Sequence, residues 1–175
     1  MISVPATPIT EQDLRTAFFT GVAEAARLLL RAQRASVAML DERAGELVFE
    51  AIAGRGGDEL LGARFPADTG IAGQALRESV TVSVPDLSGS EHFAQDIAVE
   101  SGYRPDAIVV APFRRAGRAV GVLSVLDPGS IPASERDAVL AVLVRHAEGV
   151  LSVVDELVAP IGSEAEPRPG ETSAR

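Results

Sequence analysis

The segment from Gly102 to Pro128 restricts the possible folds of this chain most strongly. Two apolar runs rich in β-branched residues flank a short turn at 116–117, and three arginines expected to be solvated surround that turn: Arg114, Arg115 and Arg118. Two such runs joined by a glycine-containing turn predict a β-hairpin. Apolar residues occupy both parities of each run, so both faces of the two strands should be covered. The other segments of the chain must supply that cover.

The segments before this hairpin predict one long helix followed by short elements. Thr10 and Asp13 have the spacing of a capping box, and the amphipathic pattern after them should continue as a helix to about Arg34. The sequence then predicts, in order, strands at 35–40 and 47–53, a glycine-rich loop at 54–66, a short helix that begins at Thr69, a strand at 80–84 and a short helix at 91–101.

The segment after the hairpin predicts a second long helix, which starts at a capping box formed by Ser134 and Asp137 and reaches about residue 158. It carries more apolar residues than one buried stripe needs, so one face can cover the sheet while another meets a partner. We assign to a homodimer interface the seam near heptad spacing: Leu140, Val144, Ala147, Leu151, Val154 and Val158. The N-terminal helix is the natural companion of this helix, within the chain or across the dimer.

Composition limits both the domain count and the chemistry. The 175 residues fit one globular domain at 11–158, between a flexible lead-in at 1–10 and a disordered tail at 159–175. The absence of Cys excludes disulfides, thiolate metal sites and cysteine nucleophiles. With no Lys and a net charge of -9, direct nucleic-acid binding is not expected. No apolar run approaches the roughly 20 residues that span a bilayer, so we expect a cytoplasmic protein without membrane contact.

The order of these elements resembles that of the GAF domain, a sensory relative of the PAS fold, over residues 11–158. The more specific matching pieces are the sequences at 69–73 (TGIAG), 84–87 (VPDL) followed by Phe93, 102–104 (GYR), 110–113 (VAPF) and 121–123 (GVL), and Asp137. The resemblance implies an α+β fold with a central antiparallel sheet of five or six strands. It places the N- and C-terminal helices on one face of the sheet and a segment that encloses a ligand pocket on the other.

Departures from the family pattern exclude several known ligands and one activity. Cyclic-nucleotide-binding members carry a signature that includes Lys, bilin-binding members attach the chromophore to Cys, and the free-methionine-sulfoxide reductases use catalytic cysteines. This chain has neither Lys nor Cys. The sequence therefore identifies no cofactor, and a haem held by one axial His is an alternative that it does not exclude.

The resemblance places the pocket beneath residues 80–104. The candidate ligand-binding residues there are Ser83, Asp86, His92, Phe93, Ile97, Tyr103 and Arg104. The planar guanidinium of Arg104 can bind a carboxylate or phosphate, or it can pair with a neighbouring Asp. Asp86 is expected to cap the turn that follows it. Ser90, His92 and Asp86 lack the strained elbow of a serine nucleophile, so we expect no catalysis.

Two functions of different classes fit this sequence. The first is a sensory module in signal transduction that binds an unidentified small molecule, with the 54–66 loop as a lid and the terminal helices as the responding elements. The second is a ligand-free module for dimerisation or protein interaction, based on the excess apolar surface of the last helix. The 175 residues contain no recognisable kinase, cyclase or helix-turn-helix segment, so under either hypothesis we expect a separate signalling or transcription partner.

Overall fold

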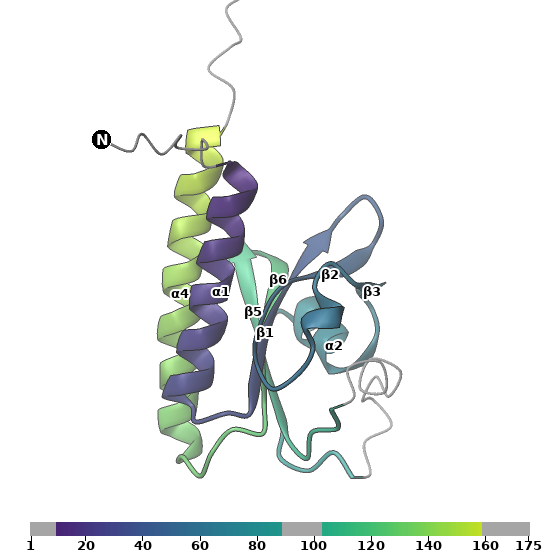
Figure 1. The fold of residues 1–175 in the computed structure, drawn as a ribbon, viewed down its shortest axis with the longest axis vertical. Coiled ribbons are helices and arrows are strands. Elements are labelled where there is room, and N and C mark those ends of the chain that lie inside the picture. Colours follow the sequence, from purple (N-terminus) through teal and green to yellow (C-terminus); the bar gives the residue numbers. More distant parts are fainter. Residues whose placement is uncertain (1–9, 89–102, 159–175) are drawn as a thin grey trace, which may run out of the picture.

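The computed structural model describes residues 10–88 and 103–158. A six-stranded antiparallel sheet in the order β3-β2-β1-β6-β5-β4 forms its centre. The strands are β1 (Arg34–Asp41), β2 (Glu46–Gly54), β3 (Arg64–Pro66), β4 (Val82–Val84), β5 (Ile108–Arg115) and β6 (Arg118–Leu126). Helices α1 (Glu11–Leu29) and α4 (Ala133–Val158) lie side by side on one face of the sheet, and α2 (Gly70–Glu78) lies on the other (Figure 1). The predicted α+β class and the placement of the terminal helices are confirmed.

The predicted hairpin is the β5–β6 pair, and its two faces enter two separate cores. Val109 and Ala111 pack with α1 and α4, together with their cross-strand partners Val125 and Leu123. Val110, on the other parity, packs in a second cluster on the face covered by α2. Burial of both faces explains why neither run alternates with polar residues.

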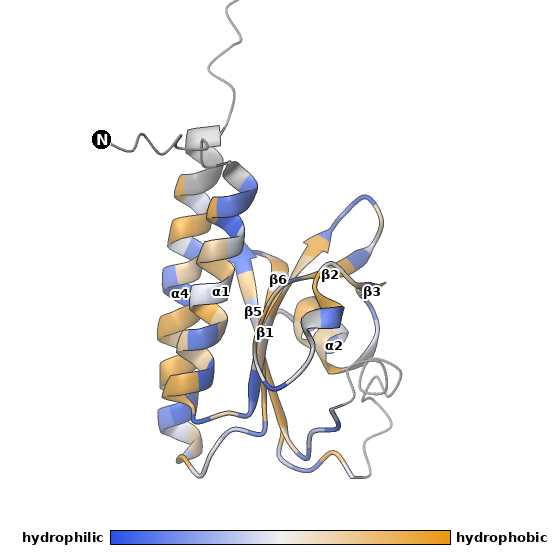
Figure 2. Ribbon diagram, viewed as in Figure 1, coloured by the Kyte–Doolittle hydropathy of each residue, from blue (hydrophilic) through white to orange (hydrophobic). Residues whose placement is uncertain are grey.

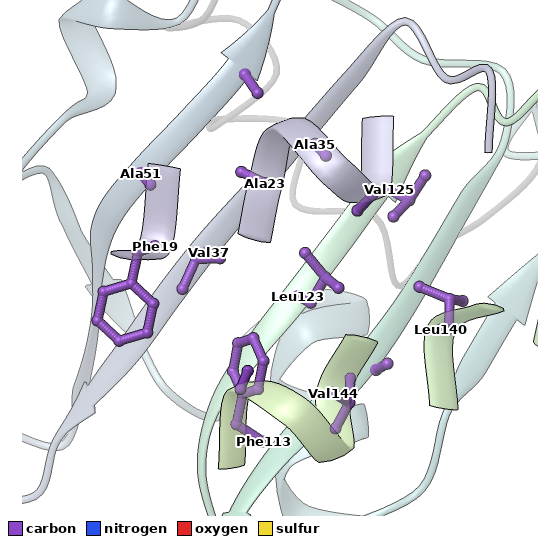
Figure 3. Close-up of a cluster of buried hydrophobic side chains, with 14 of the residues drawn as sticks. Phe19, Ala23, Ala35, Val37, Ala51, Phe113, Leu123, Val125, Leu140 and Val144 are labelled. Carbon is purple, nitrogen blue, oxygen red and sulfur yellow. The ribbon is translucent and has the colours of Figure 1, made fainter. Parts of the chain in front are cut away.

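The core beneath the terminal helices combines aromatic rings with small residues (Figure 3). Phe19 of α1 and Phe113 of β5 lie with ring centroids 6.5 Å apart, and Ala23 and Ala26 let α1 approach the sheet. Four residues of α4 are at most 6% exposed in this core: Leu140, Val144, Ala147 and Leu151. Their assignment to a dimer interface is therefore wrong, because they face the sheet and α1 of their own chain. The side chains of Val154 and Val158 lie outside the described residues.

Several element boundaries differ from the predicted ones. The capping box of Thr10 and Asp13 is present, but α1 ends at Leu29 and the chain reverses at Arg31, whose φ is +50°. Arg34 is therefore the first residue of β1. The segment expected to be only a loop holds a 3-10 turn (Asp58–Leu60) and the short edge strand β3. Helix α4 begins at Ala133, so Ser134 lies within its first turn and is not the N-cap residue.

Gly121 shows why a glycine lies inside the central strand β6. A Cβ atom there would lie 2.5 Å from the Sδ atom of Met39 and 2.7 Å from the carbonyl oxygen of Ala38. The element that approaches Gly121 is therefore β1 of the same chain.

Three predictions fall outside the described residues: the lead-in before Thr10, the helix at 91–101 and the tail at 159–175. Within the described chain, no helix is both long and apolar enough to cross a membrane.

Candidate ligand pocket

A cavity of about 90 Å³ lies between the sheet and α2. Its walls are mostly apolar and come from β1, β2, β5 and β6 on one side and from residues 60–72 on the other. Four apolar side chains illustrate the lining: Ile52, Phe65, Ile71 and Leu126. Four polar residues of the sheet and the strand entry also reach it: Arg34, Ser36, Tyr103 and Ser124.

Strand geometry explains why polar groups enter this apolar space. Arg34, Ser36 and Ala38 occupy alternate positions of β1, so their side chains share the face covered by α2. Ser36 pairs across the strands with Ser124 of β6, which also lines the cavity. The small side chains of Ser36, Ala38 and Ser124 leave the centre of the floor unfilled.

Arg34 is a buried cation, 3% exposed, that neighbouring backbone and ring atoms hold in place. Its Nε and Nη2 atoms donate hydrogen bonds to the carbonyl oxygen of Arg55 at 2.8 and 2.5 Å. Its guanidinium carbon lies 4.7 Å from the centroid of the Tyr103 ring, within the range of a cation–π interaction. Gly57 makes room for it, since a Cβ atom there would lie 3.2 Å from the guanidinium carbon. The guanidinium is thus fixed at the edge of the cavity.

Tyr103 is fixed from its other end by Asp127, which follows β6. The Tyr103 hydroxyl donates to Oδ2 of Asp127, whose Oδ1 accepts from the backbone N–H groups of Asp106 and Ala107 at 2.8 and 2.9 Å. Burial, together with the hydrogen bond to this carboxylate, raises the pKa of Tyr103 well above its ordinary value. Tyr103 therefore stays neutral at physiological pH.

Ser36 stands out because its buried hydroxyl has no hydrogen-bond partner in the described part of the chain. The side chain is 6% exposed, and among the described residues neither its Oγ atom nor that of Ser124 has a hydrogen-bond partner. A buried hydroxyl without a partner costs about 1–3 kcal/mol. Residues 70–72 in the first turn of α2 also line the cavity, and the Thr69 side chain makes no capping hydrogen bond. The cavity therefore offers hydrogen-bonding groups that a bound molecule can use.

The structure separates the predicted site residues. Tyr103 lines the cavity, whereas Ser83, Asp86 and Arg104 are exposed and do not line it. Ser83 pairs with Val109, which faces the terminal helices, so its side chain points to the wrong side of the sheet for this cavity. Asp86 caps its turn as expected, accepting a hydrogen bond from the N–H of Ser88 at 2.9 Å. The side-chain and backbone hydrogen bonds of Ser88 lower the pKa of Asp86. The other predicted residues, His92, Phe93 and Ile97, lie outside the described residues.

One arginine predicted to be solvated is instead bound. Arg114 is half-buried, its Nε atom donates to Oγ of Ser79 at 3.0 Å, and its Nη2 atom donates to the Ser79 carbonyl oxygen. It therefore ties the end of α2 to β5.

No group of three or more His, Asp or Glu side chains among the described residues is arranged to hold a metal ion. His146 lies exposed on α4, on the opposite side of the sheet from the cavity, so it is not placed to bind a haem there.

The family model of the GAF domain matches residues 13–151. The chain belongs to the GAF domain family. GAF domains are typically regulatory sensory domains of signalling proteins. No curated protein sequence matches this GAF domain.

Solved structures agree with this fold. The GAF domain of a phosphoenolpyruvate-protein phosphotransferase from Coxiella burnetii is 20% identical, with a TM-score of 0.72 over 89% of each chain. Free methionine-R-sulfoxide reductase from Neisseria meningitidis is 21% identical, with a TM-score of 0.69 over 87% of this chain and 84% of that one. The second GAF domain of DevS from Mycobacterium smegmatis is 20% identical, with a TM-score of 0.65 over 82% of this chain and 96% of that one. Identities this low establish a shared fold and do not identify a ligand.

Proposed function

We propose that this GAF domain is a non-catalytic sensory module that binds a small molecule in the cavity between the sheet and α2. The observation that carries the proposal is the buried hydroxyl of Ser36 in an apolar cavity beside the fixed guanidinium of Arg34. Buried polar groups in folded proteins are nearly always hydrogen-bonded. A ligand bound in the cavity would supply the partner that the described residues do not provide.

The contacts of Arg34 suggest how binding reaches the terminal helices. Arg34 holds the loop at Arg55, and the adjoining Gly54 packs against Arg27 of α1, where a Cβ atom would lie 2.9 Å from the Arg27 Cδ atom. A ligand that contacts Arg34 better in one arrangement of this loop shifts the population toward that arrangement. The α1 helix then responds, and a separate signalling or transcription protein reads the change.

Catalysis is not part of the proposal. The family resemblance links its reductase activity to catalytic cysteines, and this chain has no Cys. The Neisseria reductase is therefore a relative in fold, and its reaction is not transferred to this protein.

A comparison of two matched variants tests ligand binding. Ala72→Leu fills the cavity from α2, whereas Ala138→Leu places the same side chain on the exposed surface of α4. A metabolite library is screened by thermal shift and native mass spectrometry against the wild type and both variants. We expect a compound that stabilises the wild type and Ala138→Leu but not Ala72→Leu. If nothing in the library or in purified cell extract binds, or if binding survives Ala72→Leu, a sensory role for this cavity is wrong.

An interaction module is the second candidate, because apolar side chains remain exposed on the terminal helices. Leu14 and Leu28 of α1 are 56% and 62% exposed, and Val142 and Val153 of α4 are 55% and 53% exposed. Exposed apolar surface of this kind can form a protein interface. The two functions are compatible, since the cavity and these helices lie on opposite faces of the sheet.

A further inference from the structure

We propose that a hollow at the C-terminal end of α1 is a second binding site and takes a phosphate group, either as inorganic phosphate or as part of a phosphate monoester. The hollow has a volume of about 580 Å³ and lies where α1 leads into β1 and where β2 ends (Figure 1). Its walls come from residues 24–33 and 54–55, and none of these wall residues lines the cavity under α2. The proposal is therefore independent of the function proposed for that cavity.

The hollow contains two arginines whose charge no described acidic side chain balances. Arg27, Arg31 and Arg55 line it, and Glu24 is the one acidic residue among the lining residues. The Nε and Nη2 atoms of Arg27 donate hydrogen bonds to Oε2 of Glu24 at 3.1 and 3.0 Å. Arg31 and Arg55 are exposed, and in the described part of the chain neither side chain forms a hydrogen bond or an ion pair. Two guanidinium groups are therefore available to an anion.

Two arginines without acidic partners are unexpected in a chain with a net charge of -9. Elsewhere in the described chain, Arg15, Arg64 and Arg136 each form an ion pair with a carboxylate. Like charges that share one hollow repel each other. An anion bound between the two guanidinium groups would replace this repulsion by attraction.

Backbone contacts bring the two arginines to the same hollow. Arg31 lies at the reversal after α1, and Gly129 makes room for its stem, since a Cβ atom at 129 would lie 2.9 Å from the Arg31 Cβ atom. The backbone N–H of Arg55 donates to the carbonyl oxygen of Gln33 at 3.3 Å. Gly54 permits this approach, because a Cβ atom there would lie 2.3 Å from the same oxygen. The site is thus assembled without a ligand.

The charge and the donors of the hollow favour a phosphate group. A phosphate monoester carries a charge of about -1.5 to -2 near neutral pH, which two guanidinium groups can balance. The forked donors of each guanidinium match the oxygens of phosphate. A monocarboxylate would leave one of the two positive charges unbalanced. Because Arg31 and Arg55 are exposed, a bound dianion would stay partly hydrated and would avoid the desolvation cost of a buried ion.

An acidic protein segment fits this surface less well. A stable protein interface buries about 1,200–2,000 Å² in total, so such a segment would extend beyond the hollow. The chain as a whole is acidic, and a longer acidic segment would meet repulsion there. A single phosphate group fits within the hollow.

The test titrates the full chain with sodium phosphate, glycerol phosphate, acetate and a polyglutamate peptide at constant ionic strength, by calorimetry and thermal shift. We expect saturable binding of the two phosphates, and Arg31→Gln and Arg55→Gln should each weaken it about threefold, as for a lost exposed ion pair. Glu24→Gln should strengthen it about threefold, because it removes a negative charge and frees Arg27. Arg43→Gln, which removes an exposed arginine of the β1–β2 turn, is the matched control and should bind like the wild type.

Equal binding of the two phosphates would identify the phosphate group alone as the ligand, and tighter binding of glycerol phosphate would identify a phosphate monoester. Acetate binding as tight as phosphate binding overturns the proposal, as does an equal loss of affinity in Arg43→Gln and Arg31→Gln. Binding of polyglutamate without binding of phosphate overturns it in favour of an acidic protein partner. Ala72→Leu, which fills the other cavity, should bind phosphate like the wild type, and a loss there would move the anion to that cavity and overturn this site. Glu24→Gln keeps the test decisive if an arginine variant does not fold, because misfolding cannot produce a gain in affinity.

Discussion

Ser36 is the residue in which stability and function are most directly opposed. In the unliganded protein its buried hydroxyl lacks a partner among the described residues, so replacing it by a methyl group removes an unfavourable term. We therefore expect Ser36→Ala to raise the free energy of unfolding by about 1 kcal/mol in urea titrations without ligand. Ser124→Ala, at a half-buried position, is the control and should change it less. A marked loss of stability in Ser36→Ala would show that the hydroxyl is already bonded.

Tyr103 should make the free energy of unfolding depend on pH in the alkaline range. It is the only Tyr, and the chain has no Lys or Cys, so it is the only side chain that ordinarily titrates between about pH 8.5 and 12. Burial and the hydrogen bond to Asp127 raise its folded-state pKa above the ordinary value of 10.0. Above pH 10 the unfolded chain loses this proton while the folded protein retains it, so the wild type loses stability as pH rises.

We expect Tyr103→Phe to lack this alkaline loss of stability, as measured by urea unfolding from pH 8 to 11. The variant should be less stable than the wild type at pH 8, because the Asp127 carboxylate loses a donor there, and the difference should shrink above pH 10. Tyrosinate absorbance of the wild type provides an independent check, since it reports this one side chain. Titration near pH 10 in the folded protein would contradict the assignment.

Among the elements, α4 is anchored to the sheet by one polar contact as well as by its apolar seam. Oε1 of Glu148 accepts a hydrogen bond at 2.7 Å from the backbone N–H of Arg114, where β5 shifts its register against β6. Glu148→Ala leaves that part-buried N–H without its acceptor and should lower the free energy of unfolding by about 1–3 kcal/mol. Glu148→Gln retains an acceptor oxygen and should lower it less.

Chemical denaturation of these variants measures the effect, with Glu135→Ala as the matched control. Glu135 lies exposed in the first turn of the same helix, so its removal should change the free energy of unfolding by only a few tenths of a kcal/mol. If Glu148→Ala and Glu135→Ala had the same small effect, the Glu148 contact would not anchor the helix.

Elements with strong local signals were predictable, and those set by tertiary pairing were not. The β5–β6 hairpin, α1 with its capping box, α2 and α4 all follow from periodicity and turn residues. The edge strand β3 has three residues among glycines, and it forms because it pairs with β2 and because Arg64 binds Asp41 and Glu46. The sequence placed Arg34 at the end of a helix, because its role as the first residue of β1 depends on the reversal at Arg31.

For the molecule as a whole, the sheet separates the core under α1 and α4 from the cavity under α2, and the same central strands contribute to both. One parity of β1 and β6 builds the core under α1 and α4, and the other parity builds the floor of the cavity. The family resemblance predicted this division, but it placed the polar candidates near 80–104, of which Tyr103 alone among the described residues lines the cavity. Arg34 and Ser36 were not predicted as site residues, because the sequence pattern does not show that β1 is an inner strand of the sheet. The strand order and the pairing of Ser36 with Ser124 reveal that their shared face lines the cavity.

The outer surface of the terminal helices is the candidate surface for a dimer, because apolar colour runs along α4 (Figure 2). Val142, His146, Gly149 and Val153 are exposed at alternating spacings of four and three residues, which places them on one stripe of α4. Leu151 lies on the inward seam and is 3% exposed. One charged substitution on each face of α4 can therefore distinguish a residue needed for self-association from one needed for the core.

We expect Val153→Asp to leave the thermal unfolding of the monomer nearly unchanged and to weaken self-association at least tenfold in sedimentation experiments over a range of concentrations. Leu151→Asp should instead unfold the protein or lower its melting temperature strongly, because an unpaired carboxylate would be buried in the core. Ser152→Asp, at an exposed position between them, controls for charge alone. If the wild type is monomeric at every concentration, or if Val153→Asp associates as the wild type does, this stripe is not a homodimer interface. The interaction function would then need a different partner or a different surface.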